Sequence, residues 1–280
     1  MLGIVVLDRR SAMNAPFPLN HVEIHVAHAC NLKCESCSHY SDQGHKGVVS
    51  LEDAERWMAA WSGRLAPGTF SLVGGEPTIH PKLTEFLELA RRHWPRSHLR
   101  LVTNGFFLAK HPKLPLAMQR DGNASIYLSL HHRDPAYVDA IRPSVKLLID
   151  WNRRYGVPVY RYESVDRWRR MRHGTGASMQ PYEDRQPRKS WLHCSAKNWW
   201  QLYDGRMWKC SPLAYLGLQH AKYGLSEKWS PYLGYQPLHP DCSDEELQAF
   251  FRREEESVCN MCAANPEKLL LTNPLRVKAS

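Results

Sequence analysis

Three cysteines, Cys30, Cys34 and Cys37, lie in one short segment at the spacing C-x3-C-x2-C. Thiolates at these spacings can converge on one iron–sulfur cluster or on one metal ion. Three thiolates leave either centre one protein ligand short, and an open coordination position is where a substrate or cofactor binds. The segment therefore predicts a reactive metal centre. A zinc site completed by His28 or His39 is the alternative that spacing alone leaves open.

A second group of cysteines lies far along the chain, at Cys194, Cys210, Cys259 and Cys262. The turn signal Asp204-Gly205 predicts a β-hairpin that brings the first two thiols together. The pair Cys259 and Cys262 follows a predicted helix at C-x2-C spacing. This group predicts a second metal site, and a structural zinc ribbon is one form that it could take.

The first cysteine segment resembles the signature of radical S-adenosylmethionine (SAM) enzymes, and the resemblance covers roughly residues 20–165. Further motifs follow predicted strands in the order that this family shows. They are Gly74-Gly75-Glu76-Pro77, which resembles the family's GGEP motif for the SAM amino group, then Asn104 within Thr103-Asn104-Gly105, then Ser129 and Arg142, which resemble SAM-contacting residues.

The resemblance implies that the three cysteines hold a [4Fe–4S] cluster whose open iron binds SAM. An electron from the cluster, supplied by an external flavodoxin- or ferredoxin-like donor, then cleaves SAM to methionine and a 5′-deoxyadenosyl radical. Two positions depart from the family pattern. Ser36 stands where an aromatic residue usually packs on adenine, and His131 stands where an acidic residue is frequent.

The second cysteine group, with Gly205 in the pattern C-x10-G-x4-C, resembles the twitch domain, a shortened form of the SPASM domain. That resemblance implies one auxiliary [4Fe–4S] cluster held by four cysteines. The eighth cysteine, Cys242, is a free thiol, an alternative cluster ligand, or a donor of a hydrogen atom or proton near the radical.

The elements that must position these residues alternate between strands and helices of about a dozen residues, which is typical of βαβ units and a parallel sheet. We predict an α/β fold, a partial (β/α)6 TIM-like barrel with chemistry at the carboxyl ends of its strands. A small C-terminal twitch domain, a β-hairpin plus a helix, follows. The predicted divisions are an N-terminal extension (1–20), the barrel core (21–165), a linker (166–190), the twitch domain (191–265) and a C-terminal tail (266–280).

Four side chains are predicted to act on the substrate. Glu163 and Arg161 share one face of the fifth strand, at the expected barrel mouth, and His131 follows the fourth strand. Any of them could take a proton after hydrogen-atom abstraction, and Cys242 is the candidate thiol donor. A structural role is the alternative for each.

Composition limits the class of protein. The chain of 280 residues carries a net charge of +9, and it contains no apolar run long enough to cross a membrane. No export signal is apparent at the N-terminus, so clustered cysteines predict a reducing cytoplasm. The basic stretch RWRRMRH at 167–173 is either a solvated face or a region that attracts an anionic substrate. Since no nucleic-acid motif accompanies it, nucleic acid is not the expected partner.

The sequence thus predicts a radical SAM enzyme acting on a small polar substrate, sugar-like or an aminocyclitol, by dehydrogenation or epimerisation. Modification of a peptide or protein is the alternative within the family. A non-catalytic zinc or iron–sulfur protein is the alternative from another class.

Overall fold

A computed structural model describes residues 15–272, 274 and 275 of the chain. Its centre is a seven-stranded sheet in the order β5-β4-β3-β2-β1-β6-β7. Neighbouring strands are parallel except β6 and β7, which form an antiparallel hairpin. The strands are β1 (Phe17–Ala27), β2 (Leu65–Gly74), β3 (His98–Thr103), β4 (Ala124–Leu130), β5 (Val159–Glu163), β6 (Trp200–Tyr203) and β7 (Arg206–Trp208).

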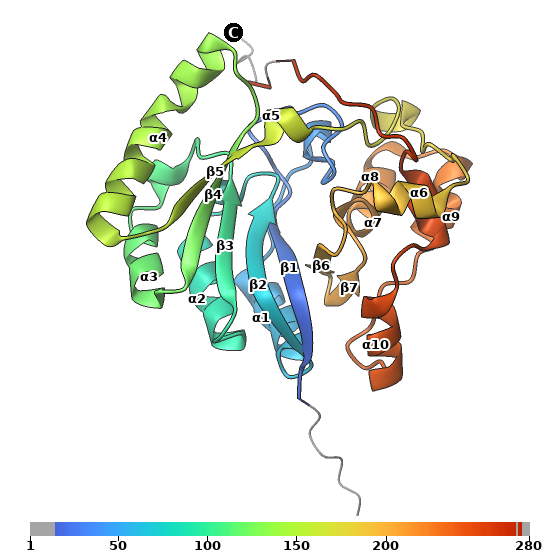
Figure 1. Cartoon of the computed structure of the whole chain (residues 1–280), viewed down its shortest axis with the longest axis horizontal. Coiled ribbons are helices and arrows are strands. Elements are labelled where there is room, and N and C mark those ends of the chain that lie inside the picture. The colour runs from blue at the N-terminus through green and yellow to red at the C-terminus, as the bar shows by residue number, and fades with distance from the viewer. Residues whose placement is uncertain (1–14, 273, 276–280) are drawn as a thin grey trace, which may run out of the picture.

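Helices α1 to α4 flank the five strands that come first in the chain, and α6 to α10 lie beyond the β6–β7 end of the sheet (Figure 1). The helices are α1 (Leu51–Ser62), α2 (Leu83–His93), α3 (Leu114–Asp121), α4 (Pro135–Tyr155), α5 (Ser164–Arg167), α6 (Pro187–Leu192), α7 (Ser211–Ala214), α8 (Leu216–Tyr223), α9 (Ser230–Leu233) and α10 (Asp244–Arg252). Within the described residues, no helix combines the length and apolarity needed to span a bilayer.

The two faces of the sheet differ because side chains alternate along each strand. In β1, Val22, Ile24 and Val26 are fully buried in the core beneath the helices. The alternate side chains, His21, Glu23 and His25, are also buried but lie on the opposite face. A sheet with one apolar face and one polar face has its core on the first and room for chemistry on the second.

The predicted α/β fold with a mainly parallel sheet is confirmed, and β6 of the predicted hairpin joins this same sheet. β6 pairs with β1 through Val22–Ile24 and Trp200–Leu202, and not with β5. The predicted hairpin and helix of the second cysteine region are present as β6, β7 and α10. Because β6 extends the same sheet, however, this hairpin is not separate from the barrel core.

The ends of the chain also differ from the predicted divisions. β1 begins at Phe17, inside the predicted extension 1–20, while residues 1–14 lie outside the described residues. The described part of the tail returns to the first cysteine segment, where Lys33 N–H donates to the carbonyl of Pro274 at 2.9 Å. The tail therefore packs beside the predicted metal centre.

Candidate active site

A cavity of about 470 Å3 lies on the polar face of the sheet and opens at the carboxyl ends of the parallel strands. This volume is within the range usual for small-molecule sites. The cavity brings together residues that the sequence predicted to act together although they are far apart along the chain: Cys37, Gly74, Gly75, Glu76, Asn104, Ser129 and His131.

Gly74 and Gly75 end β2 where it meets the backbone that leads into the first cysteine segment. Gly75 N–H donates to the carbonyl of Ala27 at 2.7 Å, and Glu76 N–H donates to that of Ala29 at 2.9 Å. A Cβ on Gly75 would lie 2.4 Å from the carbonyl oxygen of Ala29, closer than any side chain tolerates. The glycines thus let β2 hold the cysteine segment in place.

Glu76 is almost fully buried and ties β2 to the end of β3. One carboxylate oxygen accepts from Thr78 and, at 2.5 Å, from the hydroxyl of Thr103, and the other accepts from Asn104 N–H at 2.7 Å. Burial raises the pKa of Glu76, and these donors oppose the shift. The oxygen that Asn104 contacts retains acceptor capacity, which the amino group of a ligand would need.

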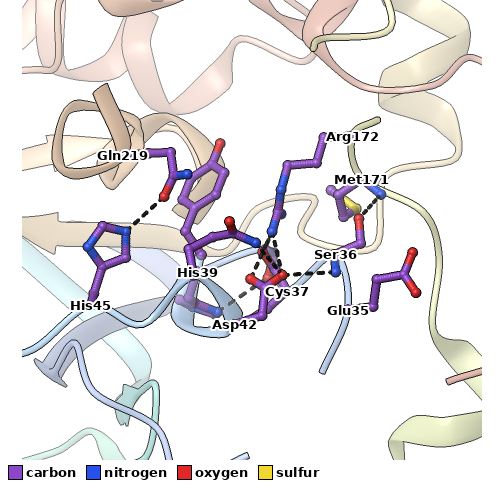
Figure 2. A network of polar contacts seen from close by, with 12 residues as sticks. Glu35, Ser36, Cys37, His39, Asp42, His45, Met171, Arg172 and Gln219 are labelled. Carbon is purple, nitrogen blue, oxygen red and sulfur yellow. Dashed lines mark hydrogen bonds and ion pairs between the residues drawn. The ribbon is translucent and has the colours of Figure 1, made fainter. Parts of the chain in front are cut away.

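The segment predicted as a linker clamps the first cysteine segment (Figure 2). The Arg172 guanidinium donates to both carboxylate oxygens of Asp42 at 2.8 Å, and both side chains are only 3% exposed. Arg172 also donates to the carbonyl of Cys37 at 2.8 Å, and Met171 N–H donates to the Ser36 hydroxyl at 2.7 Å. Residues 168–173 are therefore part of the site and not a loose connection.

The three thiols of the first group lie close enough to affect one another. Burial raises the pKa of Cys34, and the neighbouring Cys37 and Cys30 raise it further. Seven of the cysteines are free thiols: Cys34, Cys37, Cys194, Cys210, Cys242, Cys259 and Cys262. Three buried thiolates side by side would repel one another unless a cation neutralised them, so this donor set fits a metal cluster.

The four thiols of the second group line another cavity, between α6, the end of β7 and a short 3-10 helix over Ser257–Met261. Burial and the other three thiols, Cys194, Cys210 and Cys259, raise the pKa of Cys262. Buried Lys209 lines the same cavity and pairs with Glu256 at 3.0 Å. A cation beside four thiols suits a group with net negative charge.

Within the described residues, neither cysteine group has the geometry of a site for one metal ion. Among residues 15–272, 274 and 275, no three His, Cys, Asp or Glu side chains stand at the spacing that one metal ion requires. A four-iron cluster holds its thiolates further apart than one ion does, because each thiolate binds a different iron.

The radical SAM superfamily model matches residues 24–165, just over half of the chain. This chain belongs to the radical SAM superfamily. Members of this family bind SAM beside a [4Fe–4S] cluster, so both cofactors are implied for this radical SAM protein.

Curated relatives of this radical SAM protein align with about two fifths of its length. The GTP 3′,8-cyclase of Shewanella denitrificans is 27% identical over 118 residues, which are 41% of this chain and 34% of that protein. The probable GTP 3′,8-cyclase of Saccharolobus solfataricus is 31% identical over 115 residues, 41% of this chain and 35% of that protein. The match thus spans about a third of each relative's length.

One solved structure is similar over most of the chain. The crystal structure of BtrN in complex with AdoMet and 2-DOIA superposes with a TM-score of 0.50 and 16% identity, and it covers 87% of this chain and 92% of that one. At this identity the likeness is one of fold.

Several residues predicted for the radical SAM site lie outside the cavity. Arg142 is on the solvent side of α4, where it pairs with Asp139. Arg161 and Glu163 pair with each other at 3.0 Å on the face of β5 that points away from the cavity, since the alternate residue Tyr162 lines it. None of these three side chains lines the cavity, so the structure gives no support to their predicted contact with SAM or substrate.

Pro77 and Cys242 do not line the cavity either. Pro77 begins a 3-10 helix over Pro77–Ile79 and is buried there, next to Glu76. The Cys242 thiol accepts from Arg64 at 3.3 Å, at the amino end of β2, whereas the cavity is at the carboxyl ends of the strands. The geometry therefore gives no support to Cys242 as a donor to a radical.

His131 does line the cavity, beside Trp168, with ring centroids 5.6 Å apart. Burial lowers the pKa of His131 to about 4, so its ring is neutral at neutral pH. His132 instead donates from Nε2 to the carbonyl of Leu271 at 3.0 Å, and its Nδ1 accepts from Asp134 N–H at 3.0 Å. A neutral imidazole with so low a pKa is a weak base at neutral pH.

Sequence reasoning missed three residues on the floor of the cavity, Glu23 of β1, Arg100 of β3 and Gln201 of β6. The available signal was the polar alternate face of β1, His21-x-Glu23-x-His25. A strand buried on both faces is normally apolar on both. Polar residues on one face therefore indicate a lined cavity.

Glu23 should make stability depend on pH. Burial raises its pKa to about 7 from 4.5, although Gln201 and Arg100 oppose the shift. As pH rises from about 4.5 to 7, the unfolded chain loses this proton first, so the free energy of unfolding should fall by roughly 3 kcal/mol. Glu23→Gln has no titratable group at this position, so its free energy of unfolding should not fall in this way. Urea unfolding of the wild type and the variant at pH 5 and pH 8 measures both free energies. If the two proteins differ by the same free energy at both pH values, the pKa of Glu23 is not raised.

Proposed function

We propose that this radical SAM protein is an enzyme that abstracts a hydrogen atom from a small polar substrate, sugar-like or an aminocyclitol, and dehydrogenates or epimerises it. The observation that carries the proposal is the single cavity in which the first cysteine segment adjoins a polar floor. A volume of about 470 Å3 suits a small molecule better than an extended peptide, which needs an open groove.

Cys30, Cys34 and Cys37 would hold a [4Fe–4S] cluster, with SAM beside it against Gly74, Gly75, Glu76, Asn104 and Ser129. When bound, the cluster and SAM supply hydrogen-atom abstraction. The chain contributes the enclosed position of the substrate, the acceptor oxygen of Glu76 for an amino group, and the clamp by Arg172 that fixes the cysteine segment.

The second thiol group, Cys194, Cys210, Cys259 and Cys262, would hold an auxiliary [4Fe–4S] cluster of the twitch type. Such a cluster supplies one-electron transfer, which a dehydrogenation needs and an epimerisation does not. Buried Lys209 beside the thiols supports a negatively charged cluster there. An external electron donor, flavodoxin- or ferredoxin-like, is part of this proposal.

Two arginines of the basic stretch support an anionic substrate. Arg167 and Arg169 line the cavity, and no carboxylate among the described residues lies within ion-pair distance of either. Their neighbours Arg170 and Arg172 instead pair with Glu35 and Asp42. The basic stretch thus combines a structural role with a charged cavity wall, and a phosphate or carboxylate group on the substrate would meet that wall.

Iron and sulfide content after anaerobic reconstitution tests the proposal. We expect about eight irons per chain in the wild type, and about four in a variant with Cys30, Cys34 and Cys37 all changed to alanine. SAM cleavage, followed as 5′-deoxyadenosine, should be lost in that variant. Zinc in place of iron, or equal iron in both proteins, would favour a non-catalytic metal-binding protein.

A further inference from the structure

The floor of the cavity holds an acidic and a basic side chain that do not bond to each other. The nearest Glu23 carboxylate oxygen lies 3.9 Å from the Arg100 guanidinium, beyond hydrogen-bond distance. The other Glu23 oxygen accepts from the Gln201 side-chain amide at 2.7 Å. Glu23 is 3% exposed, so its carboxylate has little water to complete its hydrogen bonds.

Other groups fix Arg100. Its Nε donates to the Ser71 hydroxyl at 2.8 Å, and its Nη2 donates to His21 Nε2 at 2.7 Å. Because a guanidinium only donates, His21 Nε2 is the unprotonated nitrogen, which agrees with the lowering of its pKa to about 3 by burial and by Arg100. The guanidinium also lies over the rings of Tyr127 and Trp199, 5.0 and 5.7 Å from their centroids.

These contacts leave unused binding capacity on two residues that line the cavity. Nη1 of Arg100 has no acceptor among the described residues, and one oxygen of Glu23 has only the longer contacts to His21 and Arg100. The site therefore offers one strong donor and one strong acceptor side by side, on rigid strands, for a third group.

We propose that Glu23 and Arg100 together bind one hydroxyl group of the substrate ring. A hydroxyl can donate to the carboxylate while it accepts from the guanidinium, so it satisfies both. An ammonium group has no lone pair that could accept from Arg100, and its positive charge would be repelled by the guanidinium. A carboxylate would be repelled by the negative charge of Glu23. The inference rests on the proposed function and specifies it: the substrate carries a ring hydroxyl at the floor, and any anionic group lies at Arg167 and Arg169.

Binding of neutral cyclic polyols tests this pair without knowledge of the true substrate. The probes are myo-inositol, scyllo-inositol and glucose, titrated by calorimetry at pH 8, where Glu23 is ionised, into the reconstituted enzyme with SAM. Glucosamine and glucuronate are the charged comparators. The variants are Glu23→Gln, Arg100→Met and the double variant. The matched control is the outer pair Glu88→Gln and Arg120→Met, whose charges lie 3.9 Å apart on α2 and α3.

We expect at least one neutral polyol to bind the wild type and the control equally. Each floor variant should weaken that binding by about tenfold or more, because each removes a charged hydrogen bond. The double variant should lose little more than either single one, since both side chains contact the same hydroxyl.

Three results would overturn the inference: no binding by any neutral polyol, unchanged affinity in the floor variants, or additive losses. 5′-Deoxyadenosine formation is measured in the same preparations. If the wild type does not cleave SAM, the proposed function fails. If all variants cleave SAM while polyol affinity is unchanged, only the inference about Glu23 and Arg100 fails.

Discussion

Changing Arg172 to methionine should lower the free energy of unfolding by about 3–5 kcal/mol, because it leaves Asp42 as an uncompensated buried charge. The same change removes the donor to the Cys37 carbonyl, so the first cysteine segment should lose its fixed conformation. Urea unfolding at matched iron content measures the stability. The iron retained after gel filtration measures how firmly the segment holds its cluster.

The control is Arg92→Met, which breaks an exposed pair with Glu55 and should cost about 1 kcal/mol or less. A second variant separates charge from packing. Arg172→Met combined with Asp42→Leu removes both charges and should recover part of the lost stability. If Arg172→Met and Arg92→Met lower the free energy of unfolding equally, the buried pair of Arg172 and Asp42 does not hold the first cysteine segment in place.

Gly75→Ala should have the largest effect on the first metal centre. The added Cβ would lie 2.4 Å from the Ala29 carbonyl oxygen and 2.7 Å from its carbon, both backbone atoms that cannot rotate away. The strand end and the cysteine segment must then separate, at a cost of about 1–3 kcal/mol. We expect the variant to lose about half of its iron, while the second thiol group keeps its share.

Gly63→Ala is the matched control for that experiment. Gly63 ends α1 with a negative φ, and nothing lies within 4 Å of an added Cβ. This variant should keep all of its iron and gain about 0.4–1 kcal/mol of stability from the stiffer unfolded chain. Full iron content in Gly75→Ala would mean that the close approach to Ala29 is not needed for cluster binding.

Much of the site follows from order along the chain. Cys30, Gly75, Asn104 and Ser129 each come just after or near the end of a predicted strand, and parallel strands end at one edge of a sheet. That argument needs no knowledge of which strands pair. It therefore succeeded for Gly75, Asn104 and Ser129, which line one cavity together with Cys37 of the first cysteine segment.

The predictions that failed depend on the register between neighbouring strands, which the alternation of side chains along a single strand does not determine. Arg161 and Glu163 do share a face of β5, but the face is set by the register in which Ser129 of β4 pairs with Tyr162. Neighbours in register point the same way, so Tyr162 and not Glu163 joins Ser129 in the cavity. Likewise, alternation along β1 is enough to place Glu23 on the polar face. That Arg100 lies near Glu23 follows only from the registers of β1 with β2 and of β2 with β3, which the sequence does not show.

The pairing of β6 with β1 has a consequence for how the protein is made. Ile24 pairs with Leu202, so one edge of β1 has no partner until nearly two hundred residues have been synthesised. At about 5–20 residues per second, that edge stays open for roughly 10–40 s on the ribosome. An unpaired edge readily joins other strands, so slow translation should favour aggregation unless a chaperone covers β1.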